Sequence, residues 1–494
     1  MSADRAPRRW LEIGGIALVT VLNGLLYRTD AEDAYITYRY SLNLAEGHGP
    51  VFNAGERVEG YSNFLWMSVL ALVHAAAGIR IEQVARALGL LVAVLAVLVT
   101  RHLALILTRG NRPVASWCAL VVACAGPFAA YAMSGLETPL FVLLVVTLLV
   151  LLTQERLILA GLVGALATMT RPDGLVVFSA AALWLVWGDR SARRKVQDLL
   201  RAVLPFVIVV VSWTVWRVAY YGYLVPNALA AKTGGVGIGT HVAEGRSYLN
   251  GALTESWPWA LLVVAALTAA LLFGRRWSPS RNDGLVMLQL AVFLGFLVAT
   301  GGDWMPASRL FAPVLPLVAV MVASVWSRAT ASVDPAVATR TFGVVAGVSA
   351  LLLVSVSYTS TNQLPRVRPW NEQVEALAAQ GAWLRSSLPR GASIATFANG
   401  ALSYHAGTDM TVIDMLGLTD EHIARNGARR SPAEAPVGHR AYDDEYVIRR
   451  RPDIVIFSGG GYSTIQECSA VPPSTVGTRA PRSRSRSATE PATS

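Results

Sequence analysis

Three carboxylates follow the first apolar stretch of the chain almost at once. Asp30, Glu32 and Asp33 stand in "DAEDAYITYRY", directly after that stretch. A carboxylate at a membrane edge can act as a general base toward a hydroxyl group, or it can hold a metal ion. The alternative is a solvated polar cap above a helix. Because an amphipathic aromatic segment with Tyr35 and Arg39 follows, the loop is larger than a cap requires, and we favour a catalytic loop.

Two further acids stand at the ends of later apolar stretches. Glu137 lies in "SGLETP" and Asp303 in "GGDWMPASR". A carboxylate at membrane depth is costly, so each is a candidate functional residue. The alternative for Glu137 is a position in water at a tight turn. Trp304, beside Asp303, is either an interfacial belt aromatic or a substrate contact.

Cationic and hydrogen-bonding residues occupy equivalent places. In "TRPDG", Arg171 offers a planar fork that suits a phosphate, although Asp173 could pair with it as a local turn stabiliser. In "VPNALAAK", Asn227 offers directional hydrogen bonds and Lys232 a point charge, and Arg309 closes "GGDWMPASR". Acids for hydroxyl activation together with cations for a phosphate suit group transfer from a lipid phosphate. The sequence contains no Walker motif that would indicate a cytosolic nucleotide donor.

The elements that must position these residues are membrane spans. The chain has 494 residues, of which 53% are hydrophobic and 15% charged, against about 25% charged in soluble proteins. Apolar stretches predict a polytopic α-helical membrane protein with about eleven spans between residues 10 and 358, after a cytoplasmic N-tail at 1–9. The expected spans are 10–27, 87–107, 114–131, 138–153, 157–170, 174–187, 199–220, 257–273, 285–301, 310–327 and 342–358. The net charge of +10 does not indicate nucleic acid, because the excess Arg falls in short loops between spans.

The arginine-rich loops predict the orientation. If the apolar stretch at 63–78 only dips into the outer leaflet, every basic loop lies inside, as the positive-inside rule prefers. The first outer loop is then about 28–86. All the polar motifs named above also fall on the outer face.

The C-terminal part differs in character. Short β-rich runs and amphipathic stretches at 360–466 predict a small α/β domain outside the membrane. Residues 467–494 are rich in Ser, Arg and Pro and are expected to be a disordered tail. We interpret Cys118 and Cys124 as small core residues, and Cys468 lies in the tail.

These motifs together resemble a known family. The stretches "EDAYITYRYSLNLAEGHGPVFNAGERVEGYSNFLW", "SGLETPLF", "TRPDG", "YGYLVPNALAAK", "GGDWMPASRLFAPVLP" and "VIDMLGLTDEHIAR" are similar to actinobacterial GT-C glycosyltransferases, above all the terminal β-(1→2)-arabinofuranosyltransferases. The resemblance runs from about residue 10 to about residue 460. It implies a GT-C membrane fold over 10–358 at the plasma membrane, with its active site facing outward.

The resemblance also implies the reaction. The donor would be a polyprenyl-phosphate sugar, decaprenylphosphoryl arabinose in the arabinan case, and the acceptor a cell-wall glycan. The family's acidic pair is usually Asp-Asp, and the matching positions here are Glu32 and Asp33, so the main catalytic role falls to Asp33. The other residues named above would bind substrate. A divalent cation is left open as a cofactor.

Two alternatives remain. The same fold could use another polyprenyl-phosphate sugar such as mannose, because no motif reads the sugar. A transporter or membrane assembly factor is the non-enzyme alternative, but transporters place polar residues near the bilayer midplane. Here the polar motifs gather at one face.

Overall fold

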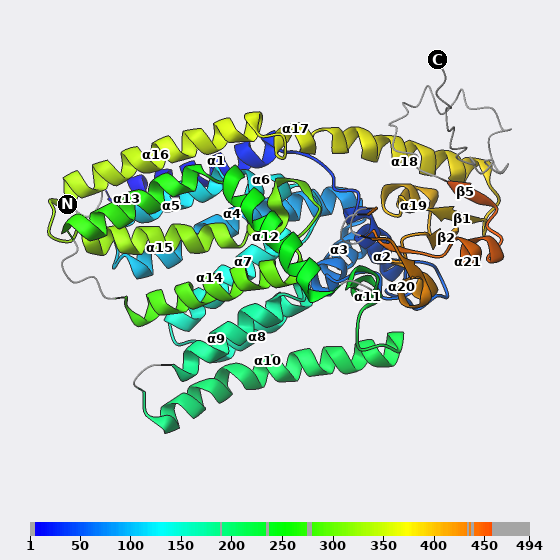
Figure 1. The fold of residues 1–494 in the computed structure, drawn as a ribbon, viewed down its shortest axis with the longest axis horizontal. Coiled ribbons are helices and arrows are strands. Elements are labelled where there is room, and N and C mark those ends of the chain that lie inside the picture. The colour runs from blue at the N-terminus through cyan, green and yellow to red at the C-terminus, as the bar shows by residue number, and fades with distance from the viewer. Residues whose placement is uncertain are drawn as a thin grey trace, which may run out of the picture.

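The computed structural model describes residues 5–187, 190–233, 237–273, 279–431, 434–435 and 439–456. It is a long helical bundle with a small α/β unit at one end (Figure 1). The helices of the bundle are α1 (Arg5–Leu26), α2 (Ala34–Ala45), α3 (Phe64–Ala77), α4 (Ile81–Leu107), α5 (Arg112–Ala123), α6 (Gly126–Ala132), α7 (Thr138–Thr153), α8 (Leu157–Thr170), α9 (Gly174–Val186), α10 (Ala192–Tyr221), α11 (Asn227–Thr233), α12 (Ile238–Glu255), α13 (Pro258–Phe273), α14 (Arg281–Thr300), the 3-10 helix η1 (Pro306–Phe311), α15 (Val314–Ala329) and α16 (Pro335–Thr359).

Local sequence signals explain where several of these helices begin. Ser280 and Asp283 form a capping box at the start of α14, in which each side chain accepts from the other's backbone. Asp334 caps α16 by accepting from the backbone N–H groups of Ala336 and Val337, ahead of a proline in the first turn. The capped ends matter here because they fix where each apolar stretch enters the bundle.

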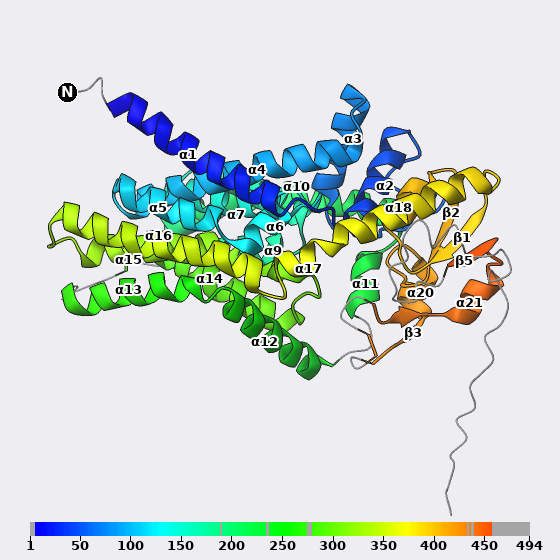
Figure 2. The same ribbon diagram turned by 90° about the horizontal axis from the view of Figure 1, so that it is seen from above.

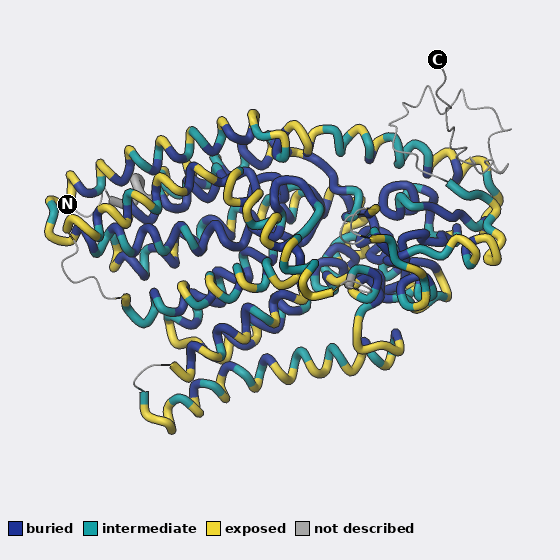
Figure 3. The backbone as a smooth tube through the Cα atoms, in the orientation of Figure 1, coloured by how far each residue is buried: buried dark blue, intermediate teal, exposed yellow. Residues whose placement is uncertain are grey.

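The core of the bundle is apolar and lies between α4, α5, α7, α8, α14 and α15. In Figure 3 the buried positions concentrate along its middle, while α10 and α16 show exposed residues along their length. On α10 these exposed residues include Leu204, Ile208 and Val211. Such a continuous apolar surface on a folded chain indicates contact with lipid rather than water.

Each expected span is helical, but the number of full-length spans is lower than expected. In the described part of the chain four helical tracts are long and apolar enough to cross a membrane: Ile81–Leu107, Ala192–Tyr221, Arg281–Thr300 and the tract Pro335–Ser387, which comprises α16 and the two helices that follow it. Two bent pairs, α5 with α6 and α12 with α13, raise the number to six. The remaining apolar helices have only 10–17 residues. The expectation of eleven is therefore not confirmed, because apolar content does not report helix length.

The expected span at 114–131 is interrupted. α5 and α6 meet at an angle of 66°. Ala125, between them, is extended at φ −75° and ψ 121°, and Pro127 follows in the first turn of α6. Proline disfavours a helical conformation of the residues before it, so one continuous helix is excluded here.

The C-terminal unit is α/β. It contains α17 (Leu364–Val367), α18 (Pro369–Ser387), α19 (Ala401–Ala406), α20 (Glu421–Asn426) and α21 (Asp444–Arg449). Its strands are β1 (Ser393–Thr396), β2 (Thr411–Asp414), β3 (Ala428–Arg429), β4 (Ala441–Tyr442) and β5 (Ile454–Ile456). A parallel sheet has the order β2-β1-β5, with Ala395 paired to Ile413 and to Val455, and β3 pairs antiparallel with β4. The boundaries 360–466 stay a prediction, and the expected tail at 467–494 lies outside the described residues.

The unit sits at the end of the bundle where the polar loops gather. Figure 1 shows α2, α11 and the C-terminal unit at one end, and the N-terminus with the α9–α10 and α15–α16 connections at the other. Figure 2 shows α3 and α12 projecting from opposite sides of the same molecule. The predicted separation of polar motifs from basic loops is therefore present, while their side of the membrane stays a prediction.

Candidate active site

The loop after α1 presents Asp33 at the N-cap of α2. Its backbone is already helical (φ −58°, ψ −24°), and its side chain makes no capping hydrogen bond. Throughout the described ranges, no group forms a hydrogen bond or ion pair with the Asp33 carboxylate. The carboxylate lies near Glu32, Tyr131 and Arg309, and its negative charge interacts electrostatically with each of them. It is therefore a half-buried acid that the protein leaves unpaired.

Asp303 and Arg309 form an ion pair close by. The Arg309 Nε atom lies 2.7 Å from Asp303 Oδ2, and the backbone N–H of Met305 donates to Oδ1 at 3.1 Å. Burial alone would raise the pKa of Asp303, but the positive charges of Arg309, Lys232 and Arg171 outweigh it and lower the pKa below its usual value. The three cations predicted from sequence therefore converge on one carboxylate.

Two of these cations differ in how they are held. Arg171 is buried and donates to both oxygens of Asp173, with Nε–Oδ1 at 2.9 Å and Nη2–Oδ2 at 3.0 Å. Its Nη1 lies 3.7 Å from Glu137 Oε1, and Asn63 donates to Glu137 Oε2 at 2.9 Å. The predicted pairing of Arg171 with Asp173 is therefore present, and its contact with a phosphate stays a prediction.

Lys232 is the less constrained cation. It lies in the last turn of α11 and is half-buried. Among the residues that the structure describes, none forms a hydrogen bond or an ion pair with its ammonium group. Asp33, Glu137, Arg171, Lys232, Asp303 and Arg309 are called the catalytic cluster below.

Glu32, the other member of the acidic pair, points to the C-terminal unit. Its Oε1 atom accepts from the backbone N–H of Gly400 at 2.6 Å and of Ala401 at 3.3 Å. A Cβ atom at Gly400 would lie 2.1 Å from the backbone oxygen of Glu32, so only glycine fits there. Burial, and then the charge of Asp33, raise the pKa of Glu32 to about 8. This geometry fits a positioning role for Glu32 better than the predicted catalytic one.

Arg39 and Asn227 do not reach the catalytic cluster. Arg39 is fully buried and donates to the carbonyls of Phe52 (2.8 Å), Gly407 (2.8 Å) and Met410 (2.7 Å), and also to that of Ser403. The prediction that Arg39 binds substrate does not fit these contacts. The buried guanidinium of Arg39 therefore links α2 to the C-terminal unit through hydrogen bonds.

Asn227 ties the α10–α11 connection to the same unit. Its Nδ2 atom lies 2.9 Å from the Gly417 carbonyl oxygen and 3.1 Å from those of Leu418 and Asp420. The amide nitrogen of Asn227 thus has a structural role, and its predicted substrate contact stays a prediction. Asn53 adds a fourth tie by exchanging two hydrogen bonds with the backbone of Val412 in β2, at 2.8 and 2.9 Å. Glu32, Arg39, Asn53 and Asn227 are called the seam below.

Tyr35 packs away from the cluster as well. It is buried in an aromatic group with Tyr38, Tyr404 and His405, at ring-centroid distances of 4.9 to 5.7 Å. Like Arg39, it joins α2 to α19 and does not contact the catalytic cluster directly. Its predicted substrate contact has no support in this packing.

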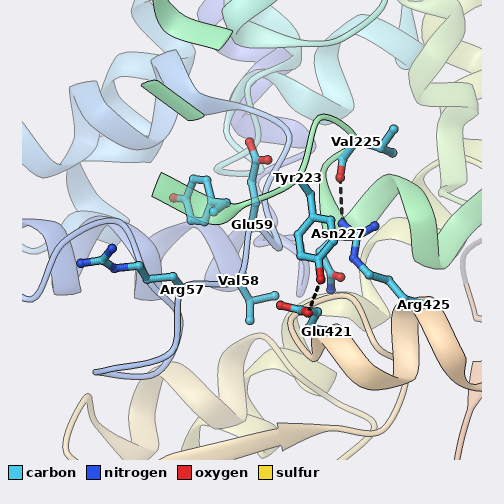
Figure 4. Close-up of a pocket in the computed structure, with 9 residues that line it drawn as sticks. Arg57, Val58, Glu59, Tyr223, Val225, Asn227, Glu421 and Arg425 are labelled. Atoms are coloured by element: carbon cyan, nitrogen blue, oxygen red, sulfur yellow. Dashed lines mark hydrogen bonds between the residues drawn. The ribbon is translucent and has the colours of Figure 1, made fainter. Parts of the chain in front are cut away.

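A pocket beside Asn227 shows how closely the seam is packed. Figure 4 shows Arg57, Glu59, Tyr223 and Arg425 around Asn227, with dashed lines for Tyr223 Oη to Glu421 Oε1 (2.7 Å) and Arg425 Nη2 to the Val225 oxygen (2.9 Å). Its free volume is about 10 Å³, which is roughly that of one water molecule. We therefore treat it as a packed interface and not as a ligand site.

Trp304 borders a larger cavity. That cavity has a volume of about 340 Å³ and is lined by residues of α12, the loop 301–308 and residues 362–366, including Asp303. The Trp304 ring also lies 5.0 Å from the His439 ring and 6.2 Å from that of Trp370. The cluster and the cavity thus share one wall.

Sequence reasoning missed Tyr131. It is fully buried in α6, and its hydroxyl donates to the carbonyl of Pro306 at 2.5 Å, which holds η1 against the bundle beside Arg309. A tyrosine inside an apolar stretch gives little signal, since such residues are usually core. The Gly-Pro pair at the start of α6 is the signal that the segment with Tyr131 does not continue the axis of α5.

No group of three or more His, Cys, Asp and Glu residues with metal-binding geometry occurs within the described ranges. The cluster therefore offers cations and single carboxylates for substrate, and the question of a divalent cation stays open.

Known proteins resemble this chain in sequence and in fold. The chain is similar to terminal beta-(1->2)-arabinofuranosyltransferases. It is 29% identical to that of Mycobacterium tuberculosis over 290 residues, which are 55% of this chain and 45% of the relative. It is 27% identical to that of Corynebacterium glutamicum over 336 residues, which are 59% of this chain and 47% of the relative. The chain thus spans about half the length of these curated relatives.

The fold has a solved counterpart. ArnT from Cupriavidus metallidurans, solved bound to undecaprenyl phosphate, aligns with a TM-score of 0.57 at 12% identity, over 85% of this chain and 88% of that one. The GT-C-type fold and the likeness to arabinofuranosyltransferases predicted from the motifs are confirmed. A family model described as a domain of unknown function (DUF8728) also matches residues 366–488.

Proposed function

We propose that this protein is a glycosyltransferase of the plasma membrane. It moves a sugar from a polyprenyl-phosphate donor to a cell-wall glycan on the outer face. The observation that carries the proposal is the unpaired Asp33 carboxylate near Arg309, whose partner Asp303 also interacts with the charges of Lys232 and Arg171. The likeness to arabinofuranosyltransferases supports arabinofuranose as the sugar, with decaprenylphosphoryl arabinose as the donor.

The cluster can divide the reaction between its members. Asp33 accepts the proton of the acceptor hydroxyl as that oxygen forms its bond to the anomeric carbon. The bond between this carbon and the phosphate oxygen breaks, and the charge stays on polyprenyl phosphate. Arg309, Lys232 and Arg171 stabilise that charge, which makes the phosphate a better leaving group. Glu137 and Asp173 hold Arg171 in place, and Asp303 holds Arg309.

Transfer assays with membranes that contain the full chain test this proposal. The donor is polyprenylphosphoryl arabinose and the acceptor a synthetic arabinan fragment, with wild type and Asp33→Asn compared. We expect a loss of about 10²–10⁴-fold in rate for Asp33→Asn, as for removal of a general base. Glu375→Gln is the matched control, because Glu375 is exposed on α18 and makes no hydrogen bond or ion pair with the described residues. Full transfer by Asp33→Asn would refute the assignment.

A different donor sugar, such as mannose, is the alternative within the same fold. Running polyprenylphosphoryl mannose in parallel separates the two. For an assembly or transport factor, Asp33→Asn would still rescue a deletion strain.

A further inference from the structure

The 340 Å³ cavity beside Asp303 has no part in the reaction as described so far. Its walls come from Glu244, Ser247, Tyr248 and Gly251 on α12, from the loop 301–308, and from Asn362 and Arg366. In Figure 2, α12 lies along the edge of the bundle, so the cavity borders the outside of the helical core. Its volume is at the lower end of the range for small-molecule sites, which is about 300–1,000 Å³.

The lining combines aromatic faces with hydrogen-bonding groups. Tyr248 and Trp304 supply rings, while Ser247, Asn362 and Arg366 supply a hydroxyl, an amide and a guanidinium. Aromatic faces carry partial negative charge and accept the polarised C–H groups of a sugar ring. Hydroxyl groups around such a ring pair with the polar side chains. This is the lining that a carbohydrate requires.

The wall is built rigidly. Gly301 and Gly302 have φ values of +85° and +76°, which side-chain-bearing residues rarely adopt. A Cβ atom at Gly302 would lie 2.3 Å from the Tyr248 ring, so the loop 301–308 packs directly on α12. Glu244, on the α12 side of the cavity, is held by an ion pair with Arg440.

The lining lacks the cations that suit a phosphate. Its two carboxylates are already ion-paired, Glu244 with Arg440 and Asp303 with Arg309, which leaves Arg366 as the remaining charged group among its lining residues. Arg309, Lys232 and Arg171, whose charges act on Asp303, are not among the lining residues, so the aromatic, hydroxyl and amide groups of the cavity suit an uncharged ligand. Asp303 belongs to both, so a sugar in the cavity lies next to the donor phosphate.

We propose that this cavity is the acceptor subsite and binds a sugar unit of a neutral oligosaccharide beside the catalytic cluster. This inference rests on the proposed function. It assigns Trp304 and Tyr248 as the stacking surface, and Ser247, Asn362 and Arg366 as hydrogen-bonding partners of the hydroxyl groups.

Two glycines of α12 allow a matched test. Gly251 lines the cavity and Gly239 lies outside its lining, yet a Cβ atom at either position meets no atom within 4 Å. Gly251→Phe should therefore fill the cavity without disturbing the fold, and Gly239→Phe is the control. Ser247→Phe, on the same exposed helix face, is a second filling variant. Equilibrium binding is measured for the full chain in lipid nanodiscs, with a synthetic arabinofuranose oligosaccharide, a mannose oligosaccharide and polyprenyl phosphate as separate probes.

We expect wild type and Gly239→Phe to bind one oligosaccharide equally, and Gly251→Phe and Ser247→Phe to bind it at least tenfold more weakly. Polyprenyl phosphate should bind all four proteins alike, which also shows that they are folded. The proposal is overturned if the filling variants bind oligosaccharide like wild type, if wild type binds neither oligosaccharide, or if filling abolishes polyprenyl phosphate binding instead. Because binding needs no turnover, a wild type that binds sugar without transferring it would refute the proposed function alone.

Discussion

At the scale of single residues, the sequence pointed to all six members of the catalytic cluster as site candidates, but it did not predict the structural contacts of the seam. The cluster residues lie at or near the ends of α2, α7, α8, α11 and α14 and in η1, and helix ends on one side of a bundle meet in space. Arg39 and Asn227 carry the same polar signal in the sequence. Most of their partners, however, are backbone carbonyls more than 180 residues away in the chain, which no local pattern reports.

Substitution of Lys232 should affect donor binding, whereas substitution of Arg171 should affect the stability of the fold. Because Lys232 has no described ion pair, Lys232→Met should weaken donor binding by about 10-fold to 100-fold, the cost of one charged hydrogen bond. Its free energy of unfolding should change by no more than about 0.5 kcal/mol. The donor KM and the thermal unfolding of the solubilised protein measure the two effects. An unchanged donor KM would remove Lys232 from the phosphate site.

Arg171→Met is the contrasting variant. It leaves the buried carboxylates of Asp173 and Glu137 without their partner, which should destabilise the protein by about 3–5 kcal/mol. Unfolding followed by tryptophan fluorescence checks this. Wild-type stability for Arg171→Met would mean that this pairing is not structural.

Glu32 should make stability fall as pH rises. Its pKa is raised to about 8 in the folded protein, so the folded state holds a proton that the unfolded chain releases at about pH 4.5. Stability therefore falls between these two pH values, by at most about 1.4 kcal/mol per pH unit. Glu32→Gln keeps an oxygen that accepts from Gly400 but does not titrate. The unfolding temperature of this variant should therefore lack the decrease with rising pH that Glu32 causes in the wild type. Identical pH profiles for the two proteins would contradict the assignment.

At the scale of elements, the apolar stretches gave the helices correctly and their lengths poorly. Hydropathy reports what a residue prefers to contact, and α8 or α15 satisfies that preference inside the bundle with only 14 or 16 residues. The bend between α5 and α6 had a visible signal in Gly126 and Pro127, but an apolar composition on both sides hid it. The Asp334 cap marks the start of α16 at Pro335, ahead of the expected span at 342–358, because hydropathy does not register the polar first turns of a helix.

The junction of α2 with α19 depends on Arg39. Arg39→Met would leave the buried carbonyls of Ser403 and Met410 unsatisfied, at a cost of about 1–3 kcal/mol each, while those of Phe52 and Gly407 keep the Asn43 side chain and the Met410 N–H as donors. We expect a lower unfolding temperature and faster proteolysis of the C-terminal unit. Arg246→Met is the control, since Arg246 is exposed on α12 and has no ion pair within the described ranges. Equal proteolysis of both variants would show that Arg39 is not a tie.

At the scale of the whole molecule, the sequence predicts that the polar end faces outward. Ala54, in the loop after α2, and Ala192, at the start of α10, are both exposed. Figure 1 shows α2 and the start of α10 at opposite ends of the bundle. A membrane-impermeant maleimide should label Ala54→Cys in intact cells, and Ala192→Cys only after permeabilisation. The unmodified chain, with Cys118, Cys124 and Cys468, gives the background. The reverse pattern would invert the topology.

The seam has a consequence for how such a protein can change over evolutionary time. Asn227 is fixed to the C-terminal unit five residues before Lys232, and Glu32 is fixed to it one residue before Asp33. The unit therefore acts as a template on which two reactive side chains are set. A recombinant chain that received a new C-terminal unit without matching residues 30–60 and 222–232 would still contain every reactive residue. Its reactive side chains would, however, be misplaced. Lineages should consequently keep these three segments as one heritable block.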